Sequence, residues 1–550
     1  MILEILLIPL LFVSFSGWGA WVKMLLGDKN DSFSLTVILG FSFFGFLTSS
    51  LSFFIPLSLY IELVLLILSL IPFFLKKMHV YLIRFPKALL KSVWFWVFCL
   101  IIIFIGSYYP FRPDHFSYYV PSVYWLNCYG LIPGVANIDW ILGQMSVFHI
   151  IQAGLDQTID PFQRLNVFIT ILFLVYLFER KAYLLLVVIP IYFLFIQTSS
   201  PDVAIVFLSL VIVNELCFNY RIDKYKILLF IAVFIFIIKP IAFWLPLWVF
   251  VASIFLNKKV LKDYQVYLIP ALLVIIFLIK NVIASSTLFY PVSLTKVNTY
   301  WLPDFRIIEL SDQLASLYTF NKYFTENEIS RMTFFHKIYS WLTISELRSI
   351  LKSILVITIL VFGVFSFFKK NSLYQMLWIT IVIKFLVIFN FSGQYRFILD
   401  GFFPLVYILF HSIRIEKTKI YIAFLSFSFL LITLISYPQL VKQSFPNFKL
   451  ANWMVGFRKK TLLTPGRYVN NLYSKENIGN LDFYISYYVL IFDTPPPAFT
   501  KKYLQLYDEL GVFPQMKDPA NIRKGYYMKT LEPEEKEKLR KIIEKYPPDD

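Results

Sequence analysis

The chain has 550 residues, of which 58% are hydrophobic, 19% are aromatic and only 15% are charged. Soluble domains carry roughly 25% charged residues, so one water-soluble core cannot bury this excess of Phe, Ile and Leu. The net charge of +17 does not indicate nucleic-acid binding, because Lys and Arg lie mostly in short loops between apolar runs, where they orient membrane proteins and contact anionic lipid.

Apolar runs of about 18 residues recur, and each could cross a ~30 Å hydrocarbon layer as a helix. Backbone polar groups must be satisfied inside lipid, and the runs do not alternate as barrel strands would, so helices are expected. The predicted fold class is an all-α polytopic membrane protein with about fourteen spans. These lie near 2–24, 33–54, 57–75, 92–109, 165–178, 182–197, 203–219, 227–238, 241–256, 266–283, 351–368, 374–391, 397–413 and 421–437.

Basic loops predict the orientation of these spans. The strongest cluster, between Lys76 and Lys91, is assigned to the cytoplasm by the positive-inside rule. The outer loops 110–164 and 284–350 and the tail 438–550 are then expected on the extracytoplasmic side. Basic residues that follow the last span would favour the cytoplasm for the tail, but long domains often translocate regardless of charge.

Three regions are predicted along the chain: N-terminal transmembrane helices (1–91), a transmembrane module (92–437) and a small extracytoplasmic C-terminal domain (438–550). Within the module, Lys239-Pro240 interrupts about 30 apolar residues that have basic loops at both ends. Because proline ends helices and a buried lysine is costly, a hairpin turn is favoured there over one long helix. The tail should contain a helix at Glu532–Tyr546.

Asp114 is the main candidate for chemistry. It follows the apolar span Ser92–Tyr109 and precedes an aromatic-rich stretch with Tyr118 and Tyr119. A carboxylate just outside the bilayer can take a proton from an acceptor hydroxyl, and the neighbouring His115 could orient it. The alternative is an Asp that caps a surface helix within an aromatic belt.

Other polar residues fall on the same predicted side. Asp139 and His149 lie in the first outer loop, where solvated loop groups are the ordinary interpretation. Asp202 stands near a predicted helix start, which is either a simple N-terminus or a place where backbone N–H groups meet a phosphate. The cations Lys239, Lys280 and Arg396 could together clamp a phosphate or pyrophosphate; snorkelling would explain each of them singly. Lys384 is a further candidate within a span.

Several familiar chemistries find no motif in the sequence. There is no Walker A loop, GxGxxG, HExxH or CxxC pair, and the three cysteines lie far apart. ATP hydrolysis and common zinc chemistry are therefore not supported. No internal repeat is seen, which weakens a transporter built on inverted repeats.

Together, these residues resemble the GT-C superfamily of membrane glycosyltransferases, and in particular a little-characterised bacterial branch. The resemblance rests on Asp114 with its aromatic helix, and covers about 92–413 and part of the tail. The other matching segments are Tyr-Gly-Leu-Ile-Pro-Gly-Val-Ala-Asn (129–137), Ser-Pro-Asp202, Leu-Phe-Tyr290-Pro291 and Gln-Tyr395-Arg396-Phe397. Three extra helices precede the matching region. No clear Asp-x-Asp is present, which leaves divalent-metal use open.

The resemblance implies inverting transfer of a sugar from a polyprenyl-phosphate donor on the extracytoplasmic face, in a bacterial inner (plasma) membrane. Asp114 would be the base. The residues expected to bind substrate are His115, Asp139, His149, Asp202, Lys239, Lys280, Tyr290, Tyr395 and Arg396. The alternatives are a polysaccharide polymerase or ligase, a lipid-linked oligosaccharide flippase or other transporter, and a membrane scaffold.

Overall fold

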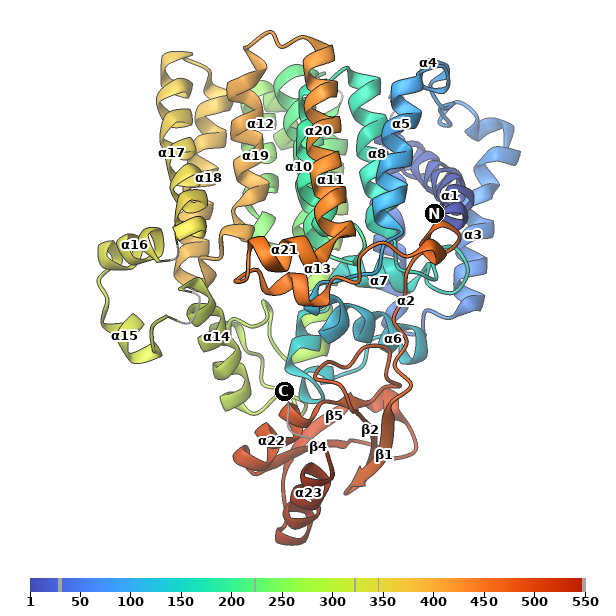
Figure 1. Cartoon of the computed structure of the whole chain (residues 1–550). Helices are drawn as coiled ribbons and strands as arrows, with labels where there is room; N and C mark the ends of the chain where they lie inside the picture. Colours follow the sequence, from blue (N-terminus) through green and yellow to red (C-terminus); the bar gives the residue numbers. More distant parts are fainter. Residues whose placement is uncertain (28–31, 222–223, 321–322, 345, 547–550) are drawn as a thin grey trace.

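The structure is a computed structural model that describes residues 1–27, 32–221, 224–320, 323–344 and 346–546. Within these ranges the chain is mostly helical, and the named β-strands all lie after residue 472. Long helices run side by side as one bundle, with the C-terminal domain at one end of it (Figure 1).

The bundle helices follow the apolar runs of the sequence. They are α1 (Ile2–Leu26), α2 (Phe33–Ser52), α3 (Leu59–Phe74), α5 (Val93–Gly106), α8 (Leu165–Arg180), α10 (Pro201–Phe218), α11 (Tyr225–Ile238), α12 (Trp244–Leu256), α13 (Gln265–Ser285), α17 (Glu346–Phe368), α18 (Ser372–Ser392), α19 (Leu399–His411) and α20 (Lys417–Ser436). Among the described residues, seven helices are long and apolar enough to cross a membrane: α1, α2, α10, α13, α17, α18 and α20. The chain is therefore a helical protein with several candidate membrane spans.

Helix lies over every one of the predicted segments. In the segment 182–197, however, the helix is divided into three short pieces, Tyr183–Val187, α9 (Val188–Ile191) and Tyr192–Leu194. It contains Pro190, and proline disrupts helix interiors. Because seven described helices meet the length and composition needed for a span, the polytopic class is supported and the count of fourteen stays a prediction.

The region around Lys239 is a hairpin, as the sequence indicated. Helix α11 ends at Ile238, Lys239 has an extended backbone, and α12 begins at Trp244 after a short turn over Pro240–Ala242. The two helices pack against each other. Lys239 therefore lies at the tip of the hairpin and not inside one long helix.

The C-terminal domain contains two small sheets that the sequence analysis did not predict. Strands β1 (Tyr473–Ile478) and β2 (Leu481–Ser486) are antiparallel, and β3 (Ala498–Phe499) pairs with β2 in parallel. Strands β4 (Val512–Met516) and β5 (Tyr526–Thr530) form an antiparallel pair. Helices α22 (Lys501–Leu510) and α23 (Pro533–Lys545) complete the domain, and α23 confirms the helix expected at Glu532–Tyr546.

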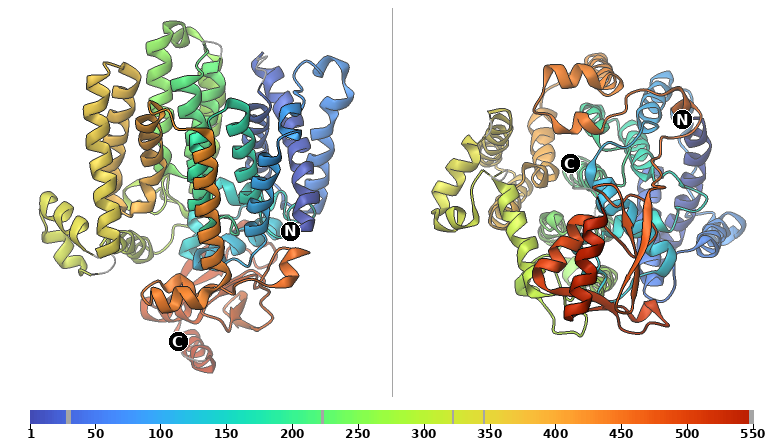
Figure 2. Two further views of the ribbon diagram at one scale, coloured as in Figure 1. Left: turned by 45° about the horizontal axis from the view of Figure 1, so that its top comes forward. Right: turned by 60° about the horizontal axis from the view of Figure 1, so that its bottom comes forward.

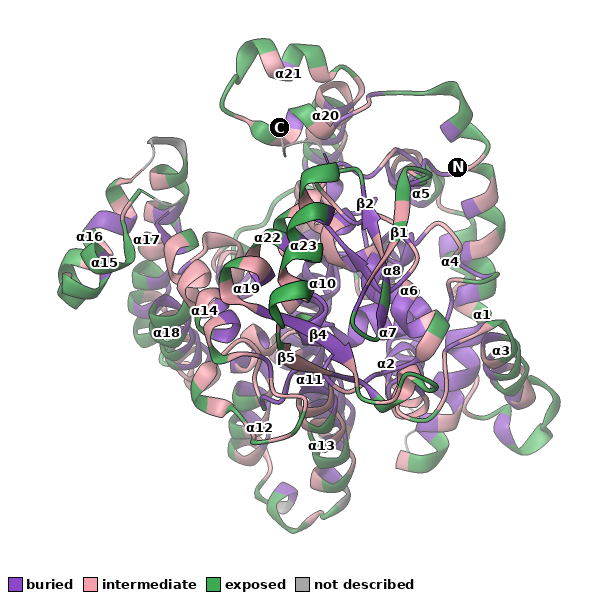
Figure 3. Cartoon of the chain, turned by 90° about the horizontal axis from the view of Figure 1, so that it is seen from below, coloured by how far each residue is buried: buried purple, intermediate pink, exposed green. Residues whose placement is uncertain are grey.

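A second hydrophobic core joins this domain to the first outer loop. It contains Trp125 and Ile138 from the loop and Phe483 and Tyr507 from the domain. Two hydrogen bonds from the Tyr507 hydroxyl to the carbonyls of Asn137 and Ile138, at 2.8 and 3.0 Å, reinforce the contact. Seen from that end, β4 is buried while α23 presents an exposed face (Figure 3). The domain and the outer loops thus lie at the same end of the bundle (Figure 2).

Candidate functional site

Asp114 stands immediately before a single π-helical turn, His115–Tyr119, that leads into α6 (Val120–Tyr129). Within the described chain its side chain makes no cap hydrogen bond to that turn. Its carboxylate instead pairs with Arg396, which donates from Nη1 to Oδ2 at 3.1 Å across 282 residues of sequence. Both side chains are about one third exposed, at 33% and 30%. Asp114 is therefore an accessible acid held by a cation, and not a helix cap.

A second acid–base pair lies beside the first. Asp202, in the first turn of α10, accepts from the Lys239 ammonium at 2.6 Å. The Lys239 Nζ atom lies 4.4 Å from the centre of the Phe397 ring, and Phe397 is the neighbour of Arg396. The hairpin tip thereby meets the short turn Tyr395–Phe397 between α18 and α19. Four predicted site residues, Asp114, Asp202, Lys239 and Arg396, are brought together in this way.

The charges of this site influence one another. Burial lowers the pKa of Lys239, although the Asp202 carboxylate opposes the shift. Burial would also lower the pKa of Arg396, but the carboxylates of Asp114 and Asp202 outweigh it and raise that pKa above its ordinary value. Burial and the same two acids raise the pKa of Tyr119. The Arg396 guanidinium therefore stays charged near neutral pH, and the Tyr119 hydroxyl stays protonated.

A small pocket connects the site to the interior of the bundle. Asp202, Arg396 and Asp400 line it together with the rings of Tyr192 and Phe195. On α19, Asp400 forms a buried ion pair with Lys384 and accepts from the Trp244 indole at 2.8 Å. Lys384 is thus neutralised beneath the outer site by its own carboxylate partner.

Sequence reasoning missed Arg112. Its guanidinium lies 3.9 Å from the centre of the Phe195 ring, and Phe195 lines the same pocket. The positive charge of Arg112 also acts on the Asp202 carboxylate. Arg112 lies two residues before Asp114 in the same segment, and this closeness in sequence is the signal that could have identified it. With Arg112, the site holds three cations and two carboxylates.

His115 lines a pocket to which Asp114 does not contribute. It lies with Phe116, Arg164 and Arg467 at the junction with the C-terminal domain, and its Nδ1 has no hydrogen-bond partner among the described residues. Among the described residues no hydrogen bond joins the His115 imidazole to the Asp114 carboxylate, so the expectation that His115 orients Asp114 is not supported. Burial, followed by the nearby Arg164, lowers the pKa of His115 and keeps the imidazole neutral.

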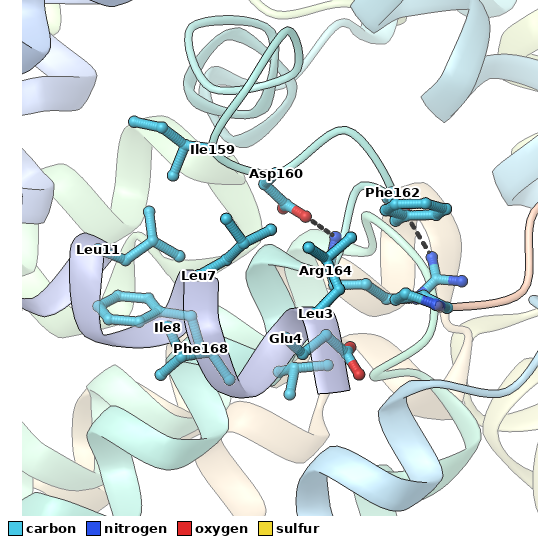
Figure 4. Close-up of a pocket in the computed structure, with 12 residues that line it drawn as sticks. Leu3, Glu4, Leu7, Ile8, Leu11, Ile159, Asp160, Phe162, Arg164 and Phe168 are labelled. Atoms are coloured by element: carbon cyan, nitrogen blue, oxygen red, sulfur yellow. Dashed lines mark hydrogen bonds between the residues drawn. The ribbon is translucent and has the colours of Figure 1, made fainter. Parts of the chain in front are cut away.

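Arg164 separates that pocket from an apolar one on its other side, lined by α1 residues such as Leu7 and Leu11 (Figure 4). Its backbone N–H donates to Asp160 at 2.7 Å and its guanidinium donates to the Phe162 carbonyl at 2.6 Å. Further bonds to the carbonyls of Gly106 and Tyr108 fix the guanidinium to backbone. Arg164 is therefore a structural residue of the loop.

The two remaining predicted site residues of the first outer loop, Asp139 and His149, are buried and not solvated. Asp139 accepts from the Ile141 N–H at 2.8 Å and begins the turn Trp140–Gln144. His149 closes a capping box on α7 (Val147–Ala153), where its Nδ1 accepts from the Ser146 N–H at 3.3 Å. Its ring lies 4.8 Å from that of Tyr119. His149 therefore supports the floor of the site, while Asp139 belongs to the junction with the C-terminal domain.

Lys280 is not part of the predicted clamp. Its ammonium is buried and donates to the Met145 carbonyl at 2.5 Å, so it ties α13 to the first outer loop. Tyr290 is half-buried and its ring lies against Gly143, near Asp139. Tyr395 adjoins Arg396 and packs on the cluster around Trp341 and Phe389. The structure thus assigns these three residues to packing around the site.

Within the described ranges, no group of three His, Cys, Asp or Glu side chains is placed to hold a metal ion.

The fold and the site define a helical protein with several candidate membrane spans and a cluster of paired charges at the end of the bundle that carries the C-terminal domain. The family model described as "Domain of unknown function (DUF8201)" matches residues 1–403, and the chain belongs to this family. Asp114, Asp202, Lys239 and Arg396 all lie within the matched residues, and the C-terminal domain lies beyond them. No curated protein and no solved structure matches the chain.

Proposed function

We propose that this protein is a GT-C-type membrane glycosyltransferase that moves a sugar from a polyprenyl-phosphate donor to an acceptor on the extracytoplasmic face. The observation that carries the proposal is the convergence of Asp114 with Arg396, Lys239 and Arg112, three cations from three separate segments. Such a cluster is suited to bind phosphate, because charge-assisted hydrogen bonds from guanidinium and ammonium groups to phosphate oxygens are strong.

Asp114 would act as the base in this reaction. The acceptor hydroxyl attacks the anomeric carbon, a glycosidic bond forms, the bond from that carbon to the phosphate oxygen breaks, and polyprenyl phosphate leaves. The hydroxyl proton passes to the Asp114 carboxylate. Because Asp114 is about one third exposed, an acceptor can reach it from the aqueous side.

The donor itself would free the base. Arg396 donates a hydrogen bond to Asp114. A phosphate that binds Arg396 competes with that carboxylate for the guanidinium, and the acid is then free to accept a proton. Asp202 keeps Lys239 in place through this exchange, because their 2.6 Å pair is the more buried of the two.

Two alternatives share this site. A polysaccharide polymerase or ligase would use the same lipid-linked substrates and the same cations. A lipid-linked oligosaccharide flippase would use the pocket that leads from Arg396 to the buried Asp400–Lys384 pair. The catalytic interpretation is favoured because this small pocket ends at Asp400, whose charge is already neutralised by Lys384.

The test is a transfer assay with purified protein in nanodiscs and radiolabelled lipid-linked sugars extracted from bacterial membranes. Release of polyprenyl phosphate with single sugar additions supports the proposal. Polymer formation would select the polymerase or ligase. Movement of the lipid across proteoliposomes without release of polyprenyl phosphate would overturn the enzyme proposal in favour of a flippase.

A further inference from the structure

The second outer loop ends in a helical arm that leaves the side of the bundle. It consists of α15 (Glu326–Arg331) and α16 (Phe334–Thr343), and α17 begins only three residues after α16 ends. Helix α16 runs across the direction of α17 beside its outer end, and α15 lies farther from the bundle (Figures 1 and 2). Because α17 is a candidate membrane span, its outer end fixes α16 near the membrane surface.

The two faces of α16 differ sharply. Phe335 and Tyr339, one helical turn apart, are 81% and 68% exposed. On the opposite face Trp341 is fully buried and packs edge-on against Phe385 and Phe389 of α18. Apolar rings therefore lie on the packed inner face of α16 and also on its exposed outer face. The outer face requires an apolar or interfacial environment.

We propose that α16 lies in the head-group region of the outer leaflet, with Phe335 and Tyr339 inserted at the boundary of the acyl chains. Helix α16 packs against α17, and the surface of α17 exposes Ile350, Ile354 and Ile357. Phe and Tyr rings are typical of this depth. His336 and Lys337 lie on the same helix, where a cation can meet anionic head groups.

The arm also holds the turn that carries Arg396. The Trp341 indole donates to the Gly393 carbonyl at 2.6 Å, and the Gly393 N–H donates to the Thr319 hydroxyl of α14 (Phe305–Thr319) at 2.8 Å. Gly393 precedes Arg396 by three residues. Trp341 is therefore a positioning residue. Its hydrogen bond to Gly393 couples the depth of α16 in the membrane to the depth of the turn that carries Arg396. The membrane location of the arm stands independently of the catalytic proposal.

The location is tested by spin labelling of a variant without native cysteines (Cys99→Ser, Cys128→Ser, Cys217→Ser) in nanodiscs of phosphatidylethanolamine and phosphatidylglycerol. Single substitutions Phe335→Cys and Tyr339→Cys carry the nitroxide. Asn327→Cys, on exposed α15, is the aqueous control, and Ile357→Cys is the lipid control. Power saturation with oxygen and with a nickel chelate then compares the accessibility of each label.

The proposal predicts labels at 335 and 339 that are at least threefold less accessible to the nickel chelate than the label at 327, and less accessible to oxygen than the label at 357. Equal nickel accessibility at 335 and 327 would place the arm in water and overturn the proposal. Labels at 335 that neither reagent reaches would place a protein partner on the face and overturn it as well. If the native protein supports transfer, Trp341→Phe should raise the KM for the donor while leaving the spin-label depths unchanged.

Discussion

The carboxylate of Asp202 and the ammonium of Lys239 lie 2.6 Å apart, joining the start of α10 to the tip of the α11–α12 hairpin. Both side chains are largely buried, at 10% and 22% exposure. Each charge therefore depends on the other for its stability, and the contact holds the hairpin tip against the turn of Arg396.

Removing either member of this pair should destabilise the protein more than removing both. Asp202→Asn or Lys239→Met alone leaves a buried charge without its partner, whereas the double variant leaves none. We expect a coupling free energy of about 1–3 kcal/mol in a double-mutant cycle, measured by unfolding in detergent. The exposed pair Glu537–Lys541 is the control and should show coupling near zero. Additive effects of Asp202→Asn and Lys239→Met would contradict the assignment.

Lys280→Met should weaken the fold and spare ligand binding. The change leaves the buried Met145 carbonyl without its donor, at a cost of about 1–3 kcal/mol. Thermal unfolding should therefore shift to lower temperature, while binding of polyprenyl phosphate, followed by native mass spectrometry, stays within twofold of wild type. A tenfold loss of affinity without loss of stability would return Lys280 to the phosphate site.

Asp139 should make stability depend on pH. Burial raises its pKa from 3.8 to about 7. Its stabilising contribution is therefore complete below pH about 4 and is lost as the pH rises through about 7, because the folded form binds a proton that the unfolded chain releases. Asp139→Asn keeps an oxygen for the Ile141 N–H and removes the ionisation. At pH 8 the variant should be more stable than wild type, by up to ~4 kcal/mol.

At pH 4 the same variant should match wild type in thermal unfolding. Asp304→Asn is the control with the opposite sign, since a hydrogen bond from Arg306 lowers the pKa of Asp304 and its loss should destabilise the protein only above pH about 4. A difference between Asp139→Asn and wild type that does not change from pH 4 to pH 8 would contradict the account.

Cys128 reports the orientation of the chain. It is exposed on α6 in the first outer loop, whereas Cys99 is buried. In intact cells a membrane-impermeant maleimide should label wild-type protein and fail to label Cys128→Ser. Labelling of Cys128 only after the membrane is permeabilised would place the outer loops, the C-terminal domain and the charged site in the cytoplasm.

The sequence predicted the helices well because hydropathy and basic loops act locally. The hairpin was predicted from the proline after Lys239, the cost of burying that lysine and the basic loops at both ends, and none of these signals depends on distant residues. The β1–β2 hairpin was missed although Gly479-Asn480, a two-residue turn pair, separates two strands of six residues. The Gly-Asn pair between two runs of six residues is the local pattern that predicts this hairpin.

Contacts between residues that are far apart in the sequence were harder to predict. Asp114 and Arg396 were both expected near the outer surface, but their contact spans 282 residues and depends on how α18 and α19 pack. Lys280 was misassigned because a lysine near a helix end has the same sequence context whether it reaches a phosphate or a backbone carbonyl. For Asp139 and His149 a solvated loop was the ordinary interpretation and a substrate site the candidate one, because the C-terminal domain and the loop packing that bury them leave no local pattern.

The most direct test of the account compares the rates of sugar transfer by Asp114→Asn and Asp304→Asn. Asp304 is a carboxylate of the second outer loop that lies away from the site and pairs with Arg306 at 2.7 Å. We predict that Asp114→Asn folds, binds polyprenyl phosphate, and transfers sugar about 10²–10⁴ times more slowly than wild type, while Asp304→Asn retains its rate. Transfer by Asp114→Asn at the wild-type rate would contradict the role of Asp114 as the base.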